Sequence, residues 1–334
     1  MTDIIFTGDP HLAIGVSIPA GRHAETFYDE QRAKLNFIKQ YGIDNKVKYL
    51  GFPGDILNYK NPSLYTASAI NSLMKELKSL DEQYTVFSIS GNHDLKFSSR
   101  NMKSESVYNI FTQGSVLSDI HGETIYINTS VSLSGIDYNA NKEEFMAEVK
   151  LLNDSLNPED VNILMIHEHL LPDGESIPFG HFYNYSAFAE FKNIKVIVSG
   201  HLHKGFETQE VSDYDIDEMT ETYRQVFINP WSLCRLSRDN YALDASHTPE
   251  LVHLSITDKG ETSYKHVIIP HKTPEEAFVK DALVDESQQA IDISEFVSQL
   301  NNVESSESEV LSTEDKSEKV KEKIEYYLEE ASNS

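Results

Sequence analysis

Cysteine is almost absent from this chain, since Cys234 is the single cysteine among 334 residues. One cysteine excludes an internal disulfide framework and is typical of proteins in a reducing compartment. Long apolar runs are also lacking, because no stretch approaches the roughly 20 apolar residues that a membrane span needs. The start, MTDIIFTGDPHL, lacks the basic and then apolar layout of a secretory signal. We therefore expect a cytoplasmic protein that does not bind membranes.

Basic residues are scarce as well: 28 lysines and arginines stand against 54 acidic residues, which gives a formal net charge of −26. Residues 271–334 contribute −11 of this charge, from 17 acidic and 6 basic side chains. A protein that coats nucleic acid without sequence preference carries a basic footprint, so the charge argues against that function. The charge does not argue against a metal enzyme, because bound divalent cations change the local sign.

Short β-rich runs alternate with helical patterns over the first 205 residues. Apolar residues recur at helical spacing in 24–42, 63–80 and 142–156. Buried strands are predicted at 3–8, 47–54, 85–91, 162–167 and 196–200, and 123–138 has the alternation of a strand pair in a second sheet. This order predicts an α/β fold in which helices cover the sheets.

The pattern changes after residue 205. We predict an acidic loop and then a strand in 205–229, and a β-hairpin at 250–270 with its turn at DKG. Two amphipathic helices, 291–300 and 317–331, flank an acidic linker. The expected domains are a catalytic unit at 1–240, a capping β region at 241–272 and an acidic helical tail at 273–334.

Five clusters of polar residues follow the segments of the first 205 residues, four of them directly after a predicted strand. Taken singly, each cluster is more simply explained as a turn. Together they indicate one site, because ligands bind beyond the carboxyl ends of strands in an open α/β sheet. The clusters are Asp9 and His11; Asp55 and Asn58; Asn92, His93 and Asp94; His167 and His169; and His201 and His203.

Carboxylate, amide and imidazole groups without a thiolate suit Mn²⁺, Fe²⁺ or Zn²⁺ better than a soft metal. The spacings Asp-x-His and His-x-His put both side chains on the same side of an extended segment, so each pair can serve one pocket. A carboxylate such as Asp55 can bridge two cations. Two cations roughly 3.5–4 Å apart can activate water and stabilise an in-line displacement at phosphorus.

The series GDPH, GD, GNHD, H and GHLH resembles the calcineurin-like metallophosphoesterase superfamily over about residues 3–205. The resemblance implies a four-layer α-β-β-α sandwich with a small β-rich capping region and a helical C-terminal tail. It also implies two divalent metal ions, most often Mn²⁺, with Mg²⁺, Fe²⁺ or Zn²⁺ as alternatives. The implied ligands of the first ion are Asp9, His11, Asp55 and His203, and those of the second are Asp55, Asn92, His167 and His201.

The same resemblance implies roles for the neighbouring residues. His93 contacts the scissile phosphate and protonates the leaving oxygen, and Asp94 lies behind His93 and orients it. Asn58 has a supporting role. His169 is a ligand, a substrate contact or a surface residue, and His167 is assigned first because it directly follows the apolar strand.

Three features are similar to SbcD-type and bacteriophage recombination nucleases. They are the segment FINPWSLCRLS at 227–237, in which Trp231 replaces a small residue, the hairpin at 250–270, and the two tail helices. The likeness implies a DNA exo- and endonuclease in recombination, repair or replication. Its expected partner is an SMC-like coiled-coil ATPase bound through the C-terminal helices, and it is expected to be a homodimer, located in the host cytoplasm if phage-encoded.

Four cations after the metal motifs are candidate phosphate contacts: Lys60, Lys96, Arg100 and Lys103. Two other functions stay open. One is a metallophosphoesterase that acts on a small phosphodiester, such as a cyclic nucleotide, or on a phosphoprotein. The other is a non-catalytic scaffold, which is disfavoured because every motif position holds a competent residue.

Overall fold

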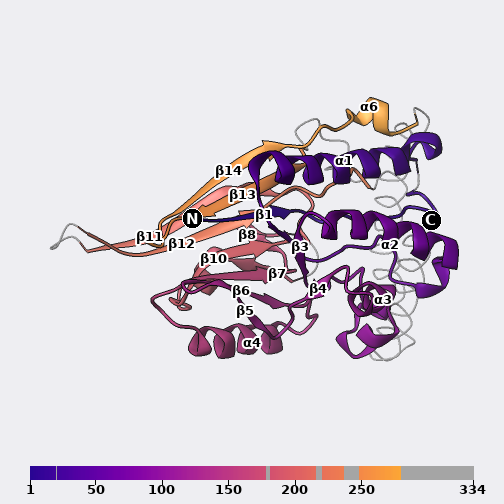
Figure 1. Cartoon of the computed structure of the whole chain (residues 1–334). Coiled ribbons are helices and arrows are strands. Elements are labelled where there is room, and N and C mark those ends of the chain that lie inside the picture. Colours follow the sequence, from indigo (N-terminus) through magenta and orange to yellow (C-terminus); the bar gives the residue numbers. More distant parts are fainter. Residues whose placement is uncertain (20, 178–180, 216–219, 237–247, 280–334) are drawn as a thin grey trace, which may run out of the picture.

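Two large β-sheets form the centre of the protein (Figure 1). The computed structural model describes residues 1–19, 21–177, 181–215, 220–236 and 248–279. The tail helices expected at 291–300 and 317–331 lie outside these residues. Within them, no helix is both long enough and apolar enough to cross a bilayer.

The first sheet has six strands in the order β14-β13-β1-β2-β3-β4. Strands β1, β2, β3 and β4 run parallel to one another, and β13 pairs antiparallel with β1. The strands are β1 (Thr2–Thr7), β2 (Tyr49–Phe52), β3 (Thr85–Ser88), β4 (Ser118–Asp119), β13 (Glu250–Ile256) and β14 (Thr262–Ile268).

The second sheet also has six strands, in the order β11-β12-β10-β7-β6-β5. Strands β6, β7, β10 and β12 are parallel, and β5 and β11 close the two edges in antiparallel pairs. The strands are β5 (Thr124–Asn128), β6 (Val131–Ile136), β7 (Val161–Ile166), β10 (Ile194–Ser199), β11 (Phe206–Asp215) and β12 (Thr220–Asn229). A separate two-stranded sheet pairs β8 (Leu170–Leu171) with β9 (Tyr183–Asn184).

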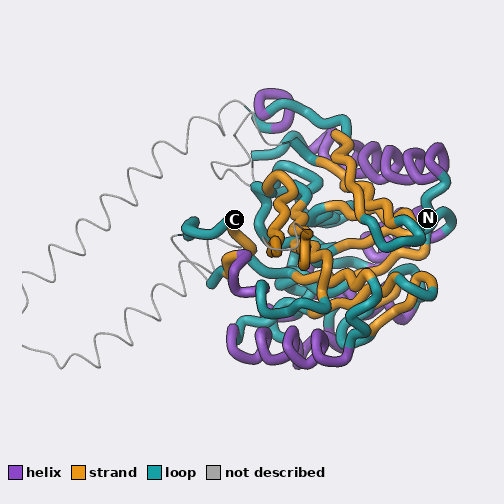
Figure 2. Tube along the Cα trace, turned by 90° about the vertical axis from the view of Figure 1, so that its left-hand side faces the viewer, coloured by secondary structure: helices purple, strands orange, loops and turns teal. Residues whose placement is uncertain are grey.

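Helices cover the outer faces of the two sheets (Figures 1 and 2). Helices α1 (Ala24–Asn45) and α2 (Ala67–Asp81) lie over the first sheet, and α4 (Lys142–Ser155) lies over the second. The Thr66 hydroxyl caps α2 and the Asn141 amide caps α4, each by accepting backbone N–H groups of the first turn. The other helices are short: α3 (Val107–Gln113), α6 (Pro274–Ala277), and the 3₁₀ turns Pro62–Leu64, Lys96–Ser98, Arg100–Glu105 and Tyr185–Phe188.

Three apolar clusters fill the three spaces between these layers. Strand β1 shows why, because its side chains alternate: Ile5 packs under α1 and α2, whereas Ile4 and Phe6 point between the sheets. On the far side, Phe145 and Val149 of α4 pack on the outer face of the second sheet. The four-layer α-β-β-α sandwich predicted from the sequence is confirmed.

The segment after residue 205 differs from its prediction. In place of an acidic loop before one strand, β11 and β12 form a long antiparallel pair. Period-2 alternation of apolar residues is weak there because β11 is an edge strand rich in acidic and polar side chains. Its partner strand compensates for the charge: Arg224 on β12 pairs with Glu210 on β11.

The hairpin predicted at 250–270 forms as β13 and β14. Strand β13 pairs with β1 from Thr2↔Ile256 to Thr7↔Leu251, so the hairpin extends the first sheet at its edge. The division into domains at 1–240, 241–272 and 273–334 stays a prediction.

A buried charge cluster joins α1 to the segment after β12. Glu30 pairs with Arg22 and, at 2.9 Å, with Lys34. The Lys34 ammonium also donates to the Leu233 carbonyl oxygen at 2.6 Å. Burial alone would raise the pKa of Glu30, but the two cations lower it below its usual value. The carboxylate is therefore the one anion that these two buried cations share.

We predict that Glu30→Ala destabilises the protein by about 3–5 kcal/mol, because it leaves two cations buried without their anion. Asp29 is the matched control, since its side chain is 79% exposed and its contact with Arg32 is a surface pair. Asp29→Ala should change the free energy of unfolding by no more than about 0.5 kcal/mol. Urea denaturation of both variants measures the difference, and equal stabilities would contradict the prediction.

Candidate metal centre

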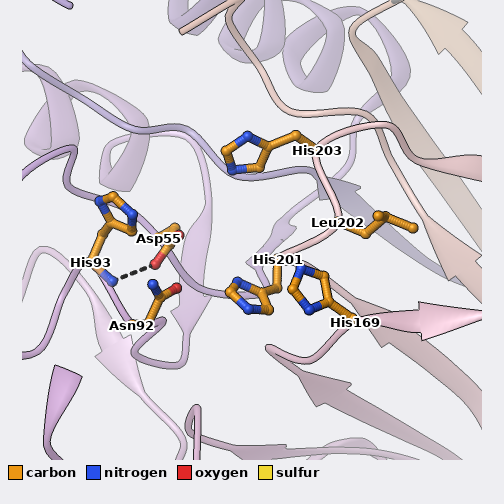
Figure 3. A pocket seen from close by; sticks show the side chains of 7 residues that line it. All are labelled: Asp55, Asn92, His93, His169, His201, Leu202 and His203. Carbon is orange, nitrogen blue, oxygen red and sulfur yellow. Dashed lines mark hydrogen bonds between the residues drawn. The ribbon is translucent and has the colours of Figure 1, made fainter. Parts of the chain in front are cut away.

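The five polar clusters meet at one edge of the sandwich. The loops after β1, β2 and β3 come from the first sheet, and those after β7 and β10 come from the second. The crevice therefore forms between the carboxyl ends of two facing sheets, and not along a single one. Figure 3 shows the pocket there, lined by Asp55, Asn92, His93, His169, His201, Leu202 and His203.

One group of potential ligands consists of Asp9, His11, Asp55 and His203, whose donor atoms all lie within 4.8 Å of one another. The Nε2 atoms of His11 and His203 are 2.9 Å apart. His11 Nε2 lies 3.5 Å from Asp55 Oδ2, and His203 Nε2 lies 3.6 Å from Asp9 Oδ2. These are the four residues that the resemblance implies for the first ion.

A second group consists of Asp55, His167 and His201, again within 4.8 Å. His167 Nε2 lies 3.3 Å from Asp55 Oδ2 and 3.2 Å from the side-chain oxygen of Asn92. His167 Nδ1 lies 2.7 Å from the Pro53 carbonyl oxygen, which fixes the ring and leaves Nε2 for the site. Asp55 belongs to both groups, as expected of a bridging carboxylate.

These distances fit cations. Two ligands at neighbouring positions, each about 2.0–2.2 Å from one ion, lie roughly 3 Å apart. Without an ion, the two imidazole nitrogens of His11 and His203 would face each other at that spacing for a single shared proton. The donor set contains only oxygen and imidazole nitrogen, which suits divalent first-row ions. The described residues can therefore hold divalent metal ions.

The electrostatics of the ion-free protein agree with this fit. Burial lowers the pKa of His11 and of His201 well below the usual value, so both rings are neutral and free to ligate. Burial raises the pKa of Asp9 to about 7, an effect to which Asp55 adds. Burial opposes protonation of His167, but the Asp55 carboxylate raises the pKa of that ring to about 10. A proton therefore takes the place that a cation could hold.

Three of the candidate ligands have strained backbones. His11, Asp55 and His201 have φ values of 42°, 48° and 72°, in the left-handed region that residues other than glycine seldom adopt. Such strain persists where the surrounding structure holds it, typically at functional sites. It turns the chain in the loops that follow β1, β2 and β10.

Neighbouring glycines allow the loops to approach this closely. A Cβ atom at Gly91 would overlap the Asp55 carboxylate, and one at Gly200 would overlap Asp9 Oδ1. The glycines of SGNHD and SGHLH are therefore needed for space around the carboxylates. Their role explains why the motifs begin with glycine directly after a buried strand.

His93 is placed by two contacts, neither of which involves Asp94. Its backbone N–H donates to Asp55 Oδ1 at 2.8 Å, and its Nδ1 lies 2.6 Å from the Asn58 carbonyl oxygen. The Nδ1 proton is therefore held by the carbonyl, and Nε2 is left for a group in the pocket. The supporting role of Asn58 is carried by its backbone oxygen.

Asp94 does not lie against His93, and the predicted contact between them is wrong. Its carboxylate accepts the backbone N–H groups of Ile56, Leu57 and Gly91 at 2.9–3.1 Å. These donors belong to the loops after β2 and β3, so Asp94 fastens the two loops to each other. The side chain is buried and does not line the pocket, and main-chain donors satisfy it.

His169 forms a wall of the pocket next to the second group. Its ring centroid lies 3.9 Å from that of His201, and its Nδ1 lies 3.3 Å from the His181 carbonyl oxygen. Burial lowers the pKa of His169 to about 4. Sequence reasoning missed the residue between the two histidines: Glu168 is fully buried, accepts the Asn139 N–H and pairs with His181 at 2.7 Å.

The four candidate phosphate contacts differ in their surroundings. Lys96 pairs with Glu105 at 2.5 Å, and Lys103 pairs with Asp119 and with Asp137. Asp137 in turn accepts the Ser90 N–H at 2.8 Å, so Lys103 supports the SGNHD loop from behind.

Arg100 is likewise used inside the protein, since it donates to the Tyr138 and Asp137 carbonyl oxygens and pairs with Glu148. Lys60 is different. It is exposed, it lies two residues after Asn58, and its charge is among the causes that lower the pKa of His93, after burial. Of the four cations, Lys60 is the one best placed to meet a phosphate.

Comparison with known proteins shows what this chain is similar to. A family model described as calcineurin-like phosphoesterase matches residues 2–205. Among curated proteins, none matches the chain. Solved structures do match, and one of them is a dimetal phosphatase from Danio rerio, with a TM-score of 0.50 and 12% identity over 81% of this chain and 99% of that one.

Another similar structure is a putative 5′-nucleotidase from Staphylococcus aureus in complex with alpha-ketoglutarate, with a TM-score of 0.47 and 14% identity. The match covers 86% of this chain but only 58% of the nucleotidase. At such identities the likeness to solved structures shows the fold alone.

We predict that the protein binds two Mn²⁺ ions per chain and that Asp55→Ala weakens both sites. Loss of an outer partner of a metal ligand already costs 10–100-fold in affinity, so loss of the shared ligand should cost more than about 100-fold. His11→Ala should weaken one site only. Isothermal titration calorimetry measures both stoichiometry and affinity.

The control is His271→Ala, because His271 is exposed and lies outside both groups. It should bind two ions with unchanged affinity. If Asp55→Ala bound two ions as tightly as the unchanged protein, the shared-ligand arrangement would be excluded.

Proposed function

The chain belongs to the calcineurin-like phosphoesterase family, and from this membership we propose that it is a two-metal DNA nuclease. The family implies a metal-dependent hydrolase of phosphoester bonds. The observation that carries the proposal is the sharing of Asp55 between two ligand groups directly beside His93. We propose Mn²⁺ as the preferred ion and the cytoplasm as the location.

In this proposal the residues of the site have separate roles in phosphodiester hydrolysis. Two bound cations would lower the pKa of water and neutralise charge on the phosphate oxygens. The Asn58 carbonyl oxygen holds the proton on Nδ1 of His93, so the ring gives a proton from Nε2 to the leaving oxygen when it is the doubly protonated imidazolium. Asp55 accepts the His93 N–H and thereby fixes the distance between the acid and the ligand groups.

The preference for DNA rests on sequence resemblance and on one set of contacts. In the segment FINPWSLCRLS, the Ser232 N–H donates to the His203 carbonyl oxygen at 3.2 Å and the Leu233 N–H donates to the Asp9 carbonyl oxygen at 2.9 Å. The turn that resembles SbcD-type nucleases thus supports two of the metal loops. The hairpin of the same resemblance, β13 and β14, lies beside β1, whose end carries Asp9.

The partner of this nuclease is proposed to be an SMC-like coiled-coil ATPase that binds the helices predicted in residues 273–334. A chain with a net charge of −26 gains little attraction for DNA from its own surface, so a partner that grips the backbone would complement it. A homodimer is part of the same proposal. Deletion of residues 285–334 should abolish capture of the ATPase and leave hydrolysis of small esters intact.

A second candidate is hydrolysis of a small phosphodiester or a phosphoprotein. The charge balance favours it, since three of the four cations near the metal motifs are neutralised by carboxylates or held within the protein. Assays with Mn²⁺ on linear duplex DNA, on bis-p-nitrophenyl phosphate and on cyclic nucleotides separate the candidates. Cleavage of the small esters with intact DNA, even with the ATPase present, would select the second.

We predict that His93→Asn lowers kcat by roughly 10²–10⁴-fold, the usual contribution of a general acid. Binding of two Mn²⁺ ions should be unchanged, because His93 belongs to neither ligand group. Single-turnover cleavage of linear DNA, with calorimetry of the same samples, tests both statements. A variant as active as the unchanged protein would rule out the acid role.

We also predict that Lys60→Ala lowers DNA affinity and reduces the slope of log affinity against log salt by about 1. Lys96→Ala and Arg100→Ala should change the slope less, because each cation already pairs with a carboxylate. Lys259, exposed in the β13–β14 turn, is the matched control. An unchanged slope for Lys60→Ala would exclude a contact between Lys60 and a DNA phosphate.

A further inference from the structure

An aromatic side chain stands exposed three residues after the GNHD motif. Phe97 is 77% exposed, more than any other large apolar side chain in the described part of the chain. Single exposed apolar residues are common on protein surfaces and need no explanation. Phe97 differs from them in its backbone conformation and in its position, and these two features are independent of its exposure.

The backbone of Phe97 is in the left-handed region, with φ 56° and ψ 27°, and Ser98 follows with φ 51°. For residues with a side chain this conformation costs about 1–2 kcal/mol each. Two consecutive residues of this kind, one of them bulky, are rare. The chain thus keeps a costly backbone conformation at the position where the ring is exposed.

Contacts on both sides of Phe97 hold this turn. Leu95 is fully buried and its carbonyl oxygen accepts the Ser98 N–H at 2.9 Å. The Lys96 carbonyl oxygen accepts the Ser99 N–H at 3.2 Å. These hydrogen bonds and the buried Leu95 therefore hold the strained turn in place, and strained backbones held in this way are typical of functional sites.

The turn is also tied directly to the metal pocket. The Ser98 hydroxyl donates to the backbone oxygen of Asn92 at 3.2 Å, and Asn92 lines the pocket. Phe97 is the fourth residue after His93, so their Cα atoms lie at most about 14 Å apart. The exposed ring therefore belongs to a turn that is hydrogen-bonded to the loop lining the metal pocket.

The chemistry around the ring favours a planar, polar partner that carries a phosphate. Lys96 Nζ lies over the ring, 5.5 Å from its centroid, and pairs with Glu105, so one face of the ring has a neutralised cation above it and the other face is left for a base. Lys60 brings a positive charge close to His93. An aromatic face beside a phosphate site is the arrangement on which proteins stack nucleobases of single strands.

We propose that Phe97 stacks on a nucleobase of the substrate strand close to the cleaved phosphate. The proposal rests on the DNA nuclease function above and makes it more specific: the substrate strand is unpaired at the site, because a base within a duplex has no free face. The ring gives no base preference, since every base has a π-face.

The test compares oligonucleotides with and without bases. Fluorescence anisotropy measures the affinity for a labelled single-stranded oligonucleotide and for its abasic counterpart, with Ca²⁺ in place of Mn²⁺ to prevent cleavage. Phe97→Ala should weaken binding of the base-containing strand by roughly 5- to 150-fold, the range for one stacked base. Binding of the abasic strand should be unchanged, and Phe97→Trp should retain the affinity.

Leu151→Ala is the matched control, because Leu151 is 72% exposed on α4 and does not line the pocket. It should bind both strands normally. Equal losses on the two strands for Phe97→Ala, or no loss on either, would overturn the stacking role. Light scattering that shows a dimer only when Phe97 is present would assign the ring to an interface between copies and would also overturn it.

The unchanged protein separates this inference from the proposed function. If it neither binds nor cleaves DNA while it hydrolyses bis-p-nitrophenyl phosphate, the DNA nuclease function fails and the stacking role fails with it. If it binds and cleaves single strands and Phe97→Ala does so equally well, only the stacking role fails.

Discussion

The site depends on a single carboxylate, Asp55, which two sets of nitrogen ligands share. The side chain is buried, its backbone is held in the left-handed region, and its oxygens lie within 3.5 Å of both His11 and His167. A buried carboxylate is costly unless charges and hydrogen bonds compensate for it. In the protein alone, protonated His167 and the His93 N–H provide this compensation. Divalent cations would provide it more fully, so metal binding and correct placement of the loops are coupled.

The sandwich supplies the rigidity that such a site needs. The candidate ligands come from five loops spread over nearly 200 residues. Each loop follows a strand whose apolar side chains are buried in the clusters between the layers. Asp94 then fastens the loops after β2 and β3 to each other, and Asp137 fastens the SGNHD loop to the second sheet through Ser90. Strained residues such as His11 and His201 can be held there because relaxing one of them would unpack a buried strand end.

Much of the fold could be predicted from the sequence because its signals are local. Apolar runs predicted β1, β7 and β10, and helical periodicity predicted α1, α2 and α4. The polar clusters after strands included all the candidate ligands that the structure brings together. The failures are equally physical. The edge strand β11 has too little apolar alternation to be recognised, and pairing with β12 decides its conformation. The group that orients His93 is a backbone oxygen, which has no signature in the side-chain sequence. Whether Lys60, Arg100 or Lys103 is available depends on partners such as Glu148 and Asp137, which are distant in sequence.

The acidic character of the protein and its phosphate chemistry can be reconciled by the position of the charges. Near the pocket, Asp9 and Asp55 repel a phosphodiester until cations reverse the sign of the site. Lys103 and Arg100 cannot do this, because they are engaged in holding Asp137 and the backbone behind the GNHD motif. Substrate attraction is therefore concentrated in the cations and in Lys60. A phosphoesterase built in this way would bind phosphate strongly only when it is loaded with metal ions. The proposed stacking contact and the proposed partner would supply the rest of the affinity for DNA.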